Sequence, residues 1–300
     1  MEISSLADLR PRTVWEIVDD AFDLYRERFA LFASLAAAVY VPAFVVYNLF
    51  MVSRFGDILK SLRTADTDPF GILGWYFQGL AVGAPLLGVA FLINIAATTA
   101  AVQAGLTGET PTLRTSFARA FHKFFALIGI ALIAAVATVL GLCGFYIGSL
   151  FVIPFFAFAP QALLIEGKGV LGAERRSRDL AGSHYGKTFG MLALLGCVAT
   201  LLSAGFQAIV TLGFNAIPRM GGDMYAKEIQ EFTVNLVSSS VITLLLAPLP
   251  GIALTLLYYD LRVRREGLDV ESEARKNGLV LADDPFGGGL NPRTPRSKRG

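Results

Sequence analysis

Few side chains in this sequence could carry nucleophilic, acid–base or metal chemistry. His122 and His184 both lie in short basic segments, and the serine run 238–240 lies inside an apolar stretch with no histidine or lysine nearby. A hydrolase or transferase needs a nucleophile, acid or base held near a partner group. Cys143 and Cys197 are not spaced like metal ligands. We therefore expect no catalytic, cofactor or metal site, and we expect that the protein is not an enzyme.

Transport is the next chemistry to consider, because uncharged polar side chains occur inside the apolar stretches. Proton- and ion-coupled carriers usually bury ionisable residues at mid-membrane, and the apolar stretches contain none. Asn94, Gln161 and Gln207 could line a polar cavity between helices broken by proline. The same side chains can instead form inter-helix hydrogen bonds, and we favour that interpretation.

Basic residues gather at the ends of the last apolar stretches. One interpretation is that they snorkel and fix orientation. The second is that they form a platform for anionic lipid headgroups or for a cytoplasmic protein. The net charge of +2 and the scatter of the basic residues do not favour nucleic acid. The candidate lipid- or partner-binding residues are Arg175, Arg176, Arg178, Asp260, Arg262, Arg264 and Arg265.

The composition and the spacing of charges determine the fold class. Apolar residues make up 54 % of the chain and charged residues 17 %, whereas soluble domains have roughly 25 % charged residues. A helix needs about 20 apolar residues to cross the hydrocarbon. One charge-free stretch is about twice that length and is broken near its middle by Gly141, Gly144 and Gly148, so we expect two helices there. The prediction is an all-α, polytopic transmembrane bundle with six spans, drawn from the charge-free stretches 30–52, 79–106, 124–165, 189–218 and 232–259.

The distribution of lysine and arginine predicts the orientation. With six spans, 21 of these residues lie on the side of both termini and five lie on the other side. Because retained lysine and arginine mark cytoplasmic loops, both termini are expected in the cytoplasm.

Each odd-numbered span follows a segment that is typical of an interfacial amphipathic helix. Thr13 and Glu16 form a capping box, the signature of a helix start. Apolar residues then recur at helical spacing, more weakly before the fifth span. Any loop beside a membrane helix can become amphipathic, which is the alternative to a true repeat. The predicted organisation is an N-terminal segment 1–12, a membrane domain 13–266 with units at about 13–106, 112–166 and 170–259, and a largely disordered cytoplasmic tail 267–300.

The polar face of the first interfacial helix is acidic, whereas helices that bind membranes independently usually carry lysine and arginine there. We therefore expect this helix to dock on the basic inner surface of the protein itself. The expected partners are the arginines at 175–178 and 262–265.

Three segments resemble one bacterial family. The segments 13–29, 173–190 and 257–269 are similar to the glycerophosphoryl diester phosphodiesterase membrane domain, over roughly residues 9 to 270. The resemblance implies six spans in the bacterial cytoplasmic (inner) membrane. It does not imply phosphodiesterase activity, because the name comes from proteins in which this region is fused to a catalytic domain that begins with His-Arg-Gly. Neither histidine here precedes Arg-Gly.

These observations favour a non-enzymatic membrane protein that organises, or binds, a lipid or protein partner at the cytoplasmic face. A transporter or lipid-handling protein with a polar cavity is the alternative. The expected surroundings are the lipid bilayer, with anionic headgroups or a cytoplasmic protein as partners and no nucleic acid.

Overall fold

The computed structural model describes residues 12–63, 69–142, 147–216 and 224–266. Within these ranges all regular structure is α-helical, which confirms the all-α prediction. The predicted tail 267–300 lies outside the described residues. The helices are α1 (Val14–Glu27), α2 (Phe29–Arg63), α3 (Pro69–Leu106), α4 (Leu113–His122), α5 (Phe124–Leu142), α6 (Ile147–Phe156), α7 (Ala159–Ile165), α8 (Val170–Ser183), α9 (Tyr185–Ala216), α10 (Met224–Leu246) and α11 (Pro248–Glu266).

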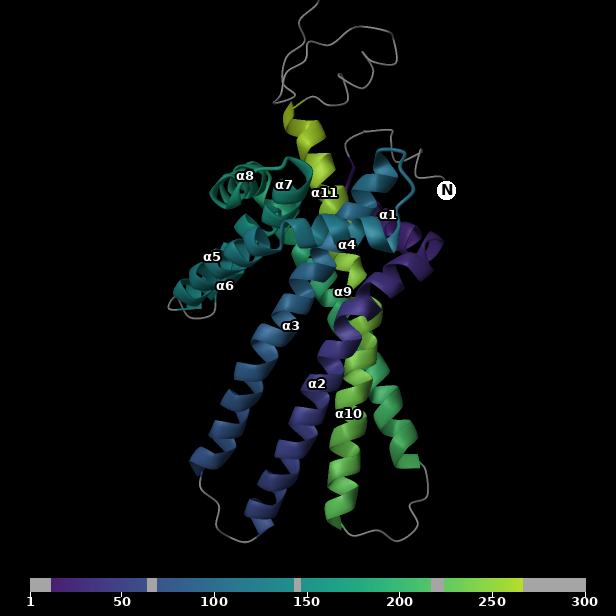
Figure 1. Cartoon of the computed structure of the whole chain (residues 1–300), viewed down its shortest axis with the longest axis vertical. Coiled ribbons are helices and arrows are strands. Elements are labelled where there is room, and N and C mark those ends of the chain that lie inside the picture. The colour runs from purple at the N-terminus through teal and green to yellow at the C-terminus, as the bar shows by residue number, and fades with distance from the viewer. Residues whose placement is uncertain (1–11, 64–68, 143–146, 217–223, 267–300) are drawn as a thin grey trace, which may run out of the picture.

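Long apolar helices dominate the described part of the chain, as expected of a multi-pass membrane protein. Four helical segments are long and apolar enough to cross a bilayer, and up to five if the bent pair α4–α5, with a 62° bend, is counted as one span. This number is smaller than the six expected. In Figure 1 the α5–α6 hairpin projects sideways, whereas α2, α3, α9 and α10 run along the long axis. The four segments are Phe29–Lys60, Leu73–Leu106, Tyr185–Ala216 and Ala226–Arg265.

The fourth expected span is broken into α6 and α7, which explains part of the difference. Pro160 lies in the first turn of α7. A backbone N–H in the first turn has no acceptor within the helix, so proline loses no intrahelical hydrogen bond there. The break exposes backbone groups, and Ser177 of α8 satisfies two of them. Its Oγ accepts from the Phe158 N–H at 3.0 Å and donates to the Phe155 carbonyl at 2.7 Å. A serine that is distant in sequence thus stabilises the break.

A second break separates α10 from α11 at Ala247, just before Pro248. Proline cannot continue the helical hydrogen-bond ladder. Carbonyls at the break accept side-chain hydrogen bonds instead. The Asn94 Nδ2 of α3 donates to the Ala247 carbonyl at 2.8 Å, and the Tyr25 hydroxyl of α1 donates to the Leu245 carbonyl at 2.8 Å. These bonds fix the break against two other helices.

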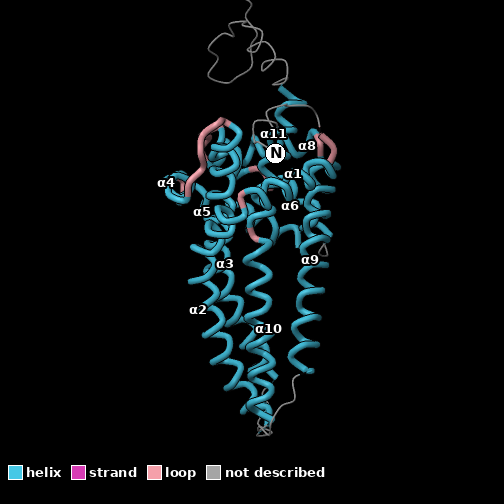
Figure 2. Tube along the Cα trace, turned by 90° about the vertical axis from the view of Figure 1, so that its right-hand side faces the viewer, coloured by secondary structure: helices cyan, strands magenta, loops and turns pink. Residues whose placement is uncertain are grey.

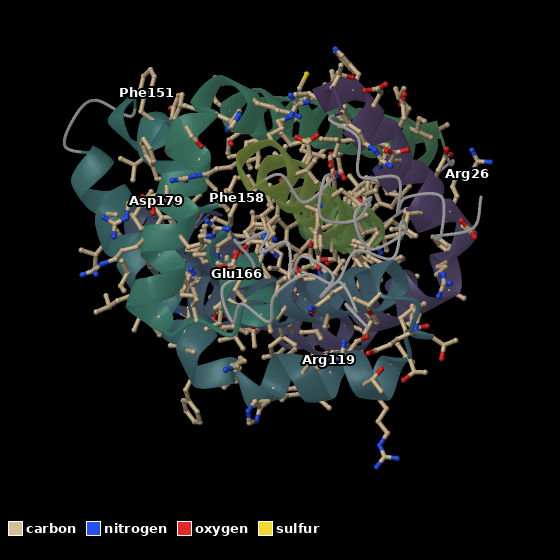
Figure 3. All side chains as sticks on the ribbon, turned by 90° about the horizontal axis from the view of Figure 1, so that it is seen from above. Arg26, Arg119, Phe151, Phe158, Glu166 and Asp179 are labelled. Atoms are coloured by element: carbon tan, nitrogen blue, oxygen red, sulfur yellow. The ribbon has the colours of Figure 1, made fainter. Side chains whose placement is uncertain are left out.

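The main core lies at one end of the bundle, which we call the capped end because α1, α4, α7 and α8 cover it there (Figure 1). Seen from this end, α11 lies at the centre and the shorter helices surround it (Figure 3). The helices approach closely: a Cβ added to Gly251 of α11 would lie 2.9 Å from Thr98 of α3. Fully buried side chains from α1, α2, α5, α8 and α11 and from the N-cap of α7 meet here, among them Ile17, Phe32, Leu127, Phe158, Leu180 and Tyr258.

Away from the capped end, the long helices extend along the long axis of the molecule (Figure 2). They expose large apolar side chains there. On α9, Leu201, Ile209 and Leu212 are 67 %, 72 % and 71 % exposed. Large apolar side chains at such density are unfavourable in water but favourable in hydrocarbon. The exposed surface of α9 is therefore suited to lipid contact.

Helix α1 begins with the predicted capping box, in which Thr13 and Glu16 bond to each other's backbone N–H groups. It packs on the protein itself, chiefly against α11, through buried apolar residues. For Asp20 of this helix, the expected ionic partners were wrong. Asp20 pairs with Arg12, just before the helix, at 2.5 Å. The reason is proximity: Arg12 precedes α1 by two residues and is held in place by α11.

Candidate functional site

A buried carboxylate at the capped end ties three segments together. Asp260 of α11 has a side chain that is 3 % exposed. Its Oδ1 accepts the Arg12 backbone N–H at 2.6 Å, and its Oδ2 accepts from Lys187 Nζ at 2.5 Å and from Arg264 Nε at 3.0 Å. Lys187 and Arg264 also donate to the Arg12 carbonyl, at 2.5 and 2.7 Å. The N-terminal segment, α9 and α11 are thus held by one polar cluster.

A second cluster centres on Glu166, the C-cap of α7, which lies towards the centre of the capped end in Figure 3. Its carboxylate accepts hydrogen bonds from the Tyr258 hydroxyl and from Arg176 Nε at 2.9 Å. Lys168 Nζ and Arg262 Nε lie 3.0 and 3.6 Å away. Burial alone would raise the pKa of Glu166, but the hydrogen bonds from Tyr258, Lys168 and Arg176 outweigh it, and the pKa is lowered. The ionised carboxylate is therefore a stable centre for α7, α8 and α11.

The two clusters divide the set of predicted lipid- or partner-binding residues. Asp260 and Arg264 belong to the first cluster, and Arg176 and Arg262 contact Glu166 in the second. These four stabilise the protein's own inner contacts. The remaining three members are exposed and form no ion pair within the described ranges. These three are Arg175, Arg178 and Arg265.

Sequence reasoning did not identify Glu166 as a site residue. The only available signal was its position, as the acid that ends a long charge-free stretch. Its partner Tyr258 is 92 residues away, so no local pattern predicts the contact.

A cavity of about 400 Å³ lies beside α4 at the same end. We call it the basic cavity, because Arg119, His122 and Lys123 line it together with Gln103 of α3. Arg119 also pairs with Glu109 at 2.7 Å, and both side chains are substantially exposed. The sequence places His122 in a short basic segment and predicts no catalytic role for it. The cavity was missed because it forms only where α3, α4 and α7 meet. Its remaining lining residues are Ala100, Ala118 and Leu164.

The three predicted cavity-lining residues lie in two different environments. Asn94 and Gln161 are fully buried, and the Asn94 Oδ1 and both polar atoms of the Gln161 amide have no hydrogen-bond partner in the described part of the chain. Gln207 instead joins α9 to α10: its Nε2 donates to Asn235 Oδ1, and its Oε1 accepts from Ser238 at 2.8 Å. None of the three lines the basic cavity.

Glu174 of α8 is an unusual buried acid. It is 0 % exposed, and neither carboxylate oxygen has a hydrogen-bond partner among the described residues. Burial raises its pKa to about 7, although Arg178 opposes the shift. A carboxyl group in this position is largely protonated below neutral pH.

The other polar groups that could carry chemistry are dispersed. His184 caps the end of α8 and lies 3.1 Å from the Ser183 hydroxyl. Within the residues that the structure describes, no three His, Cys, Asp or Glu side chains are grouped as a metal site would require.

Comparison with known proteins adds no relative: no family model matches the chain, and no curated protein or solved structure has significant similarity to it.

Proposed function

We propose that this chain is a non-enzymatic integral membrane protein that binds anionic lipid headgroups at the cytoplasmic surface through its capped end. In this proposal the chain crosses the bacterial cytoplasmic (inner) membrane six times, with both termini inside. The resemblance to the phosphodiesterase-associated membrane domain supports this location, and it carries no catalytic role.

Helix lengths support six crossings. Helix α5 has 19 residues, which is about 28 Å at 1.5 Å per residue and close to the hydrocarbon thickness of about 30 Å. Helices α6 and α7 together cover 147–165, with backbone groups at the break satisfied by Ser177. Polar backbone in a membrane is tolerated where protein satisfies it.

The observation that carries the proposal is the surface of α4 and α8. On α4, Arg114 is exposed beside Leu113, which is 41 % exposed, and on the same helix as Phe121, which is 56 % exposed. On α8, Arg175 is exposed near Leu171, which is 65 % exposed. Cations beside exposed apolar side chains are typical of helices that lie in an anionic membrane surface. The acidic helix α1 packs on α11 instead.

The internal clusters hold α8 and α11 in place without neutralising the exposed arginines of these two helices. Asp260 and Glu166 form ion pairs with the inner cations. The exposed arginines of α8 and α11 remain available to anionic headgroups. Each cation near an anionic surface contributes about 1 kcal/mol to attraction. Several cations on one surface therefore select anionic over neutral lipid.

The test measures which lipids the protein retains when it is extracted from membranes with their native lipid. Wild-type protein should be enriched in anionic lipid relative to the bulk membrane. The combined variant Arg175→Gln, Arg178→Gln and Arg265→Gln should lose most of this enrichment. A matched variant at the opposite end, Arg54→Gln with Lys60→Gln, should keep it.

Unchanged enrichment in the capped-end variant would contradict the lipid proposal. Loss of one co-purified soluble protein, with lipid composition unchanged, would instead identify a protein partner at this surface.

A transporter is the second candidate, and one observation favours it. Gln161 lies two residues after the start of α7, next to the break between α6 and α7. It is buried, and its amide has no hydrogen-bond partner among the described residues. Polar groups at broken helices form substrate sites in carriers. Uptake of a solute by reconstituted vesicles, abolished by Gln161→Leu, would favour this function over lipid binding.

A further inference from the structure

An apolar groove of about 670 Å³ lies along α3, between this helix and the hairpin of α5 and α6. Nearly all of its lining is aliphatic or aromatic. The single hydroxyl in the lining, on Thr138, donates to the carbonyl of Ala134 in its own helix at 2.7 Å. Water needs polar partners to occupy a cavity. The groove is therefore suited to hydrocarbon.

Small side chains on two helices create the space. Ala131, Ala134 and Ala135 of α5 line the groove opposite Ala84 and Gly88 of α3. A Cβ added at Gly88 would meet no atom within 4 Å, so the groove is open at this point.

The groove and the basic cavity lie on the same side of α3. Val89 and Leu92 line the groove, and Ala100 and Gln103, each eleven residues later, line the basic cavity. Eleven residues at 100° each return to within about 20° of the starting direction, about 16 Å further along the helix. On α7 the order is the same, because Pro160 and Leu164 are one turn apart. The basic cavity thus lies further along the same face of α3, towards the capped end.

The lining side chains change from apolar in the groove to cationic in the basic cavity. The basic cavity carries Arg119, His122 and Lys123 and the amide of Gln103, and its lining contains no acid. Glu109 lies outside the lining and pairs with Arg119. An anionic group with an attached hydrocarbon chain matches both parts.

We infer that the groove and the basic cavity form one site for a single anionic phospholipid, with an acyl chain along α3 and the phosphate beside Lys123 and Gln103. This inference rests on the proposed function and adds a defined location to it. Lipid is the occupant because the α3 part of the groove lining, from Ala84 to Ile95, falls within the apolar span Leu73–Leu106, where acyl chains are the available apolar molecules.

The site predicts a different result from general attraction to an anionic surface. General attraction depends on the total charge of the capped end. The site requires, in addition, an empty groove and a cation at one particular position.

The experiment is native mass spectrometry of the full chain in non-ionic detergent, titrated with phosphatidylglycerol or phosphatidylcholine. Wild-type protein should retain one phosphatidylglycerol with preference. Gly88→Phe, which fills the groove, should weaken retention of this lipid at least fivefold. Gly205→Phe is the control, because Gly205 of α9 is also open but lies outside the groove. If Gly88→Phe does not fold, Ala135→Phe fills the groove from α5.

The headgroup is tested separately. Lys123→Gln should reduce the preference for phosphatidylglycerol about fivefold, the effect of one cation near an anionic headgroup. Arg26→Gln removes an exposed cation of α1 at the same end, which belongs neither to the cavity lining nor to the surface of α4 and α8, and it should change the preference less than twofold.

Three outcomes would overturn the site. Retention in Gly88→Phe equal to that of wild type would show that the groove holds no lipid. Equal losses from Lys123→Gln and Arg26→Gln would leave the surface attraction of the proposed function intact but contradict the site. Displacement of the lipid by inorganic phosphate at equal concentration would show that the basic cavity binds free anions without the chain.

Discussion

Replacing Asp260 with asparagine should destabilise the capped end more than any change of an exposed charge. The Asp260 side chain is 3 % exposed, and its partner Lys187 is 15 % exposed. The asparagine would leave a buried ammonium group without its counter-charge. Removing one member of a buried ion pair costs about 3 to 5 kcal/mol. Because Lys187 keeps its bond to the Arg12 carbonyl, we expect a loss of about 3 kcal/mol.

The assay is equilibrium unfolding of purified protein in mixed micelles, with helicity as the readout. Asp179→Asn is the matched control, because Asp179 is an exposed acid of α8 at the same end. An exposed substitution of this kind should change the free energy of unfolding by less than about 0.5 kcal/mol.

A double-mutant cycle tests whether the loss comes from the ion pair. Combining Asp260→Asn with Lys187→Met removes both charges, so the double variant should be less destabilised than the sum of the single variants by at least about 1 kcal/mol. Equal effects of Asp260→Asn and Asp179→Asn, or simple additivity in the cycle, would refute the role of Asp260 as the centre of the cluster.

Three further predictions follow from single buried groups. Ser177→Ala should lower the free energy of unfolding by about 1 to 3 kcal/mol, because backbone groups at the break between α6 and α7 lose their partner, whereas Ser239→Ala, on an exposed hydroxyl, should have little effect. The free energy of unfolding should fall as pH rises from about 4.5 to 7, by about 3 kcal/mol from Glu174 alone, because the pKa of Glu174 is raised from the ordinary 4.5 to about 7 and the folded state binds the proton more tightly. Glu174→Gln should remove this part of the pH dependence. An unchanged pH profile in this variant would show that the carboxyl is not buried as described. Gly251→Ala should destabilise the protein by about 1 to 3 kcal/mol, since the added methyl would lie 2.9 Å from Thr98 of α3. Gly196→Ala is the control, because the space around Gly196 is open. Equal stability of the two variants would contradict the close packing of α11 on α3.

Much of the helical organisation could be predicted from local patterns. Charge-free stretches longer than about 20 residues predicted the long helices, because a bilayer has no other way to accept such segments. The capping box at Thr13 and Glu16 predicted the start of α1. These features depend on residues close together in sequence.

The breaks in the helices could not be placed in the same way. Proline at 154 and 160 indicated a disturbance, but a proline can bend a helix or end it. The result depends on whether another segment satisfies the freed backbone groups. Ser177 provides that partner here, from a helix whose position against α7 no local pattern indicates.

The candidate site shows the same limit. The arginines of α8 and α11 could be recognised as a basic surface, but their division into internal and exposed members depends on Glu166 and Asp260. The basic cavity and the apolar groove are formed by side chains from three or more helices. Both cavities result from the packing of several helices against one another. The periodicity of a sequence describes the faces of each helix separately and does not predict such packing.

The orientation of the capped end is the central claim, and cysteine labelling in intact cells tests it most directly. Single cysteines would be placed in a background without Cys143 and Cys197, then treated with an impermeant thiol reagent. Positions 60, 142 and 227 should be labelled, since six spans place the ends of α2 and α5 and the start of α10 outside the cell. Positions 119 and 175, at the capped end, should react only after the membrane is opened. Labelling of 119 or 175 in intact cells, with 60 protected, would contradict the account.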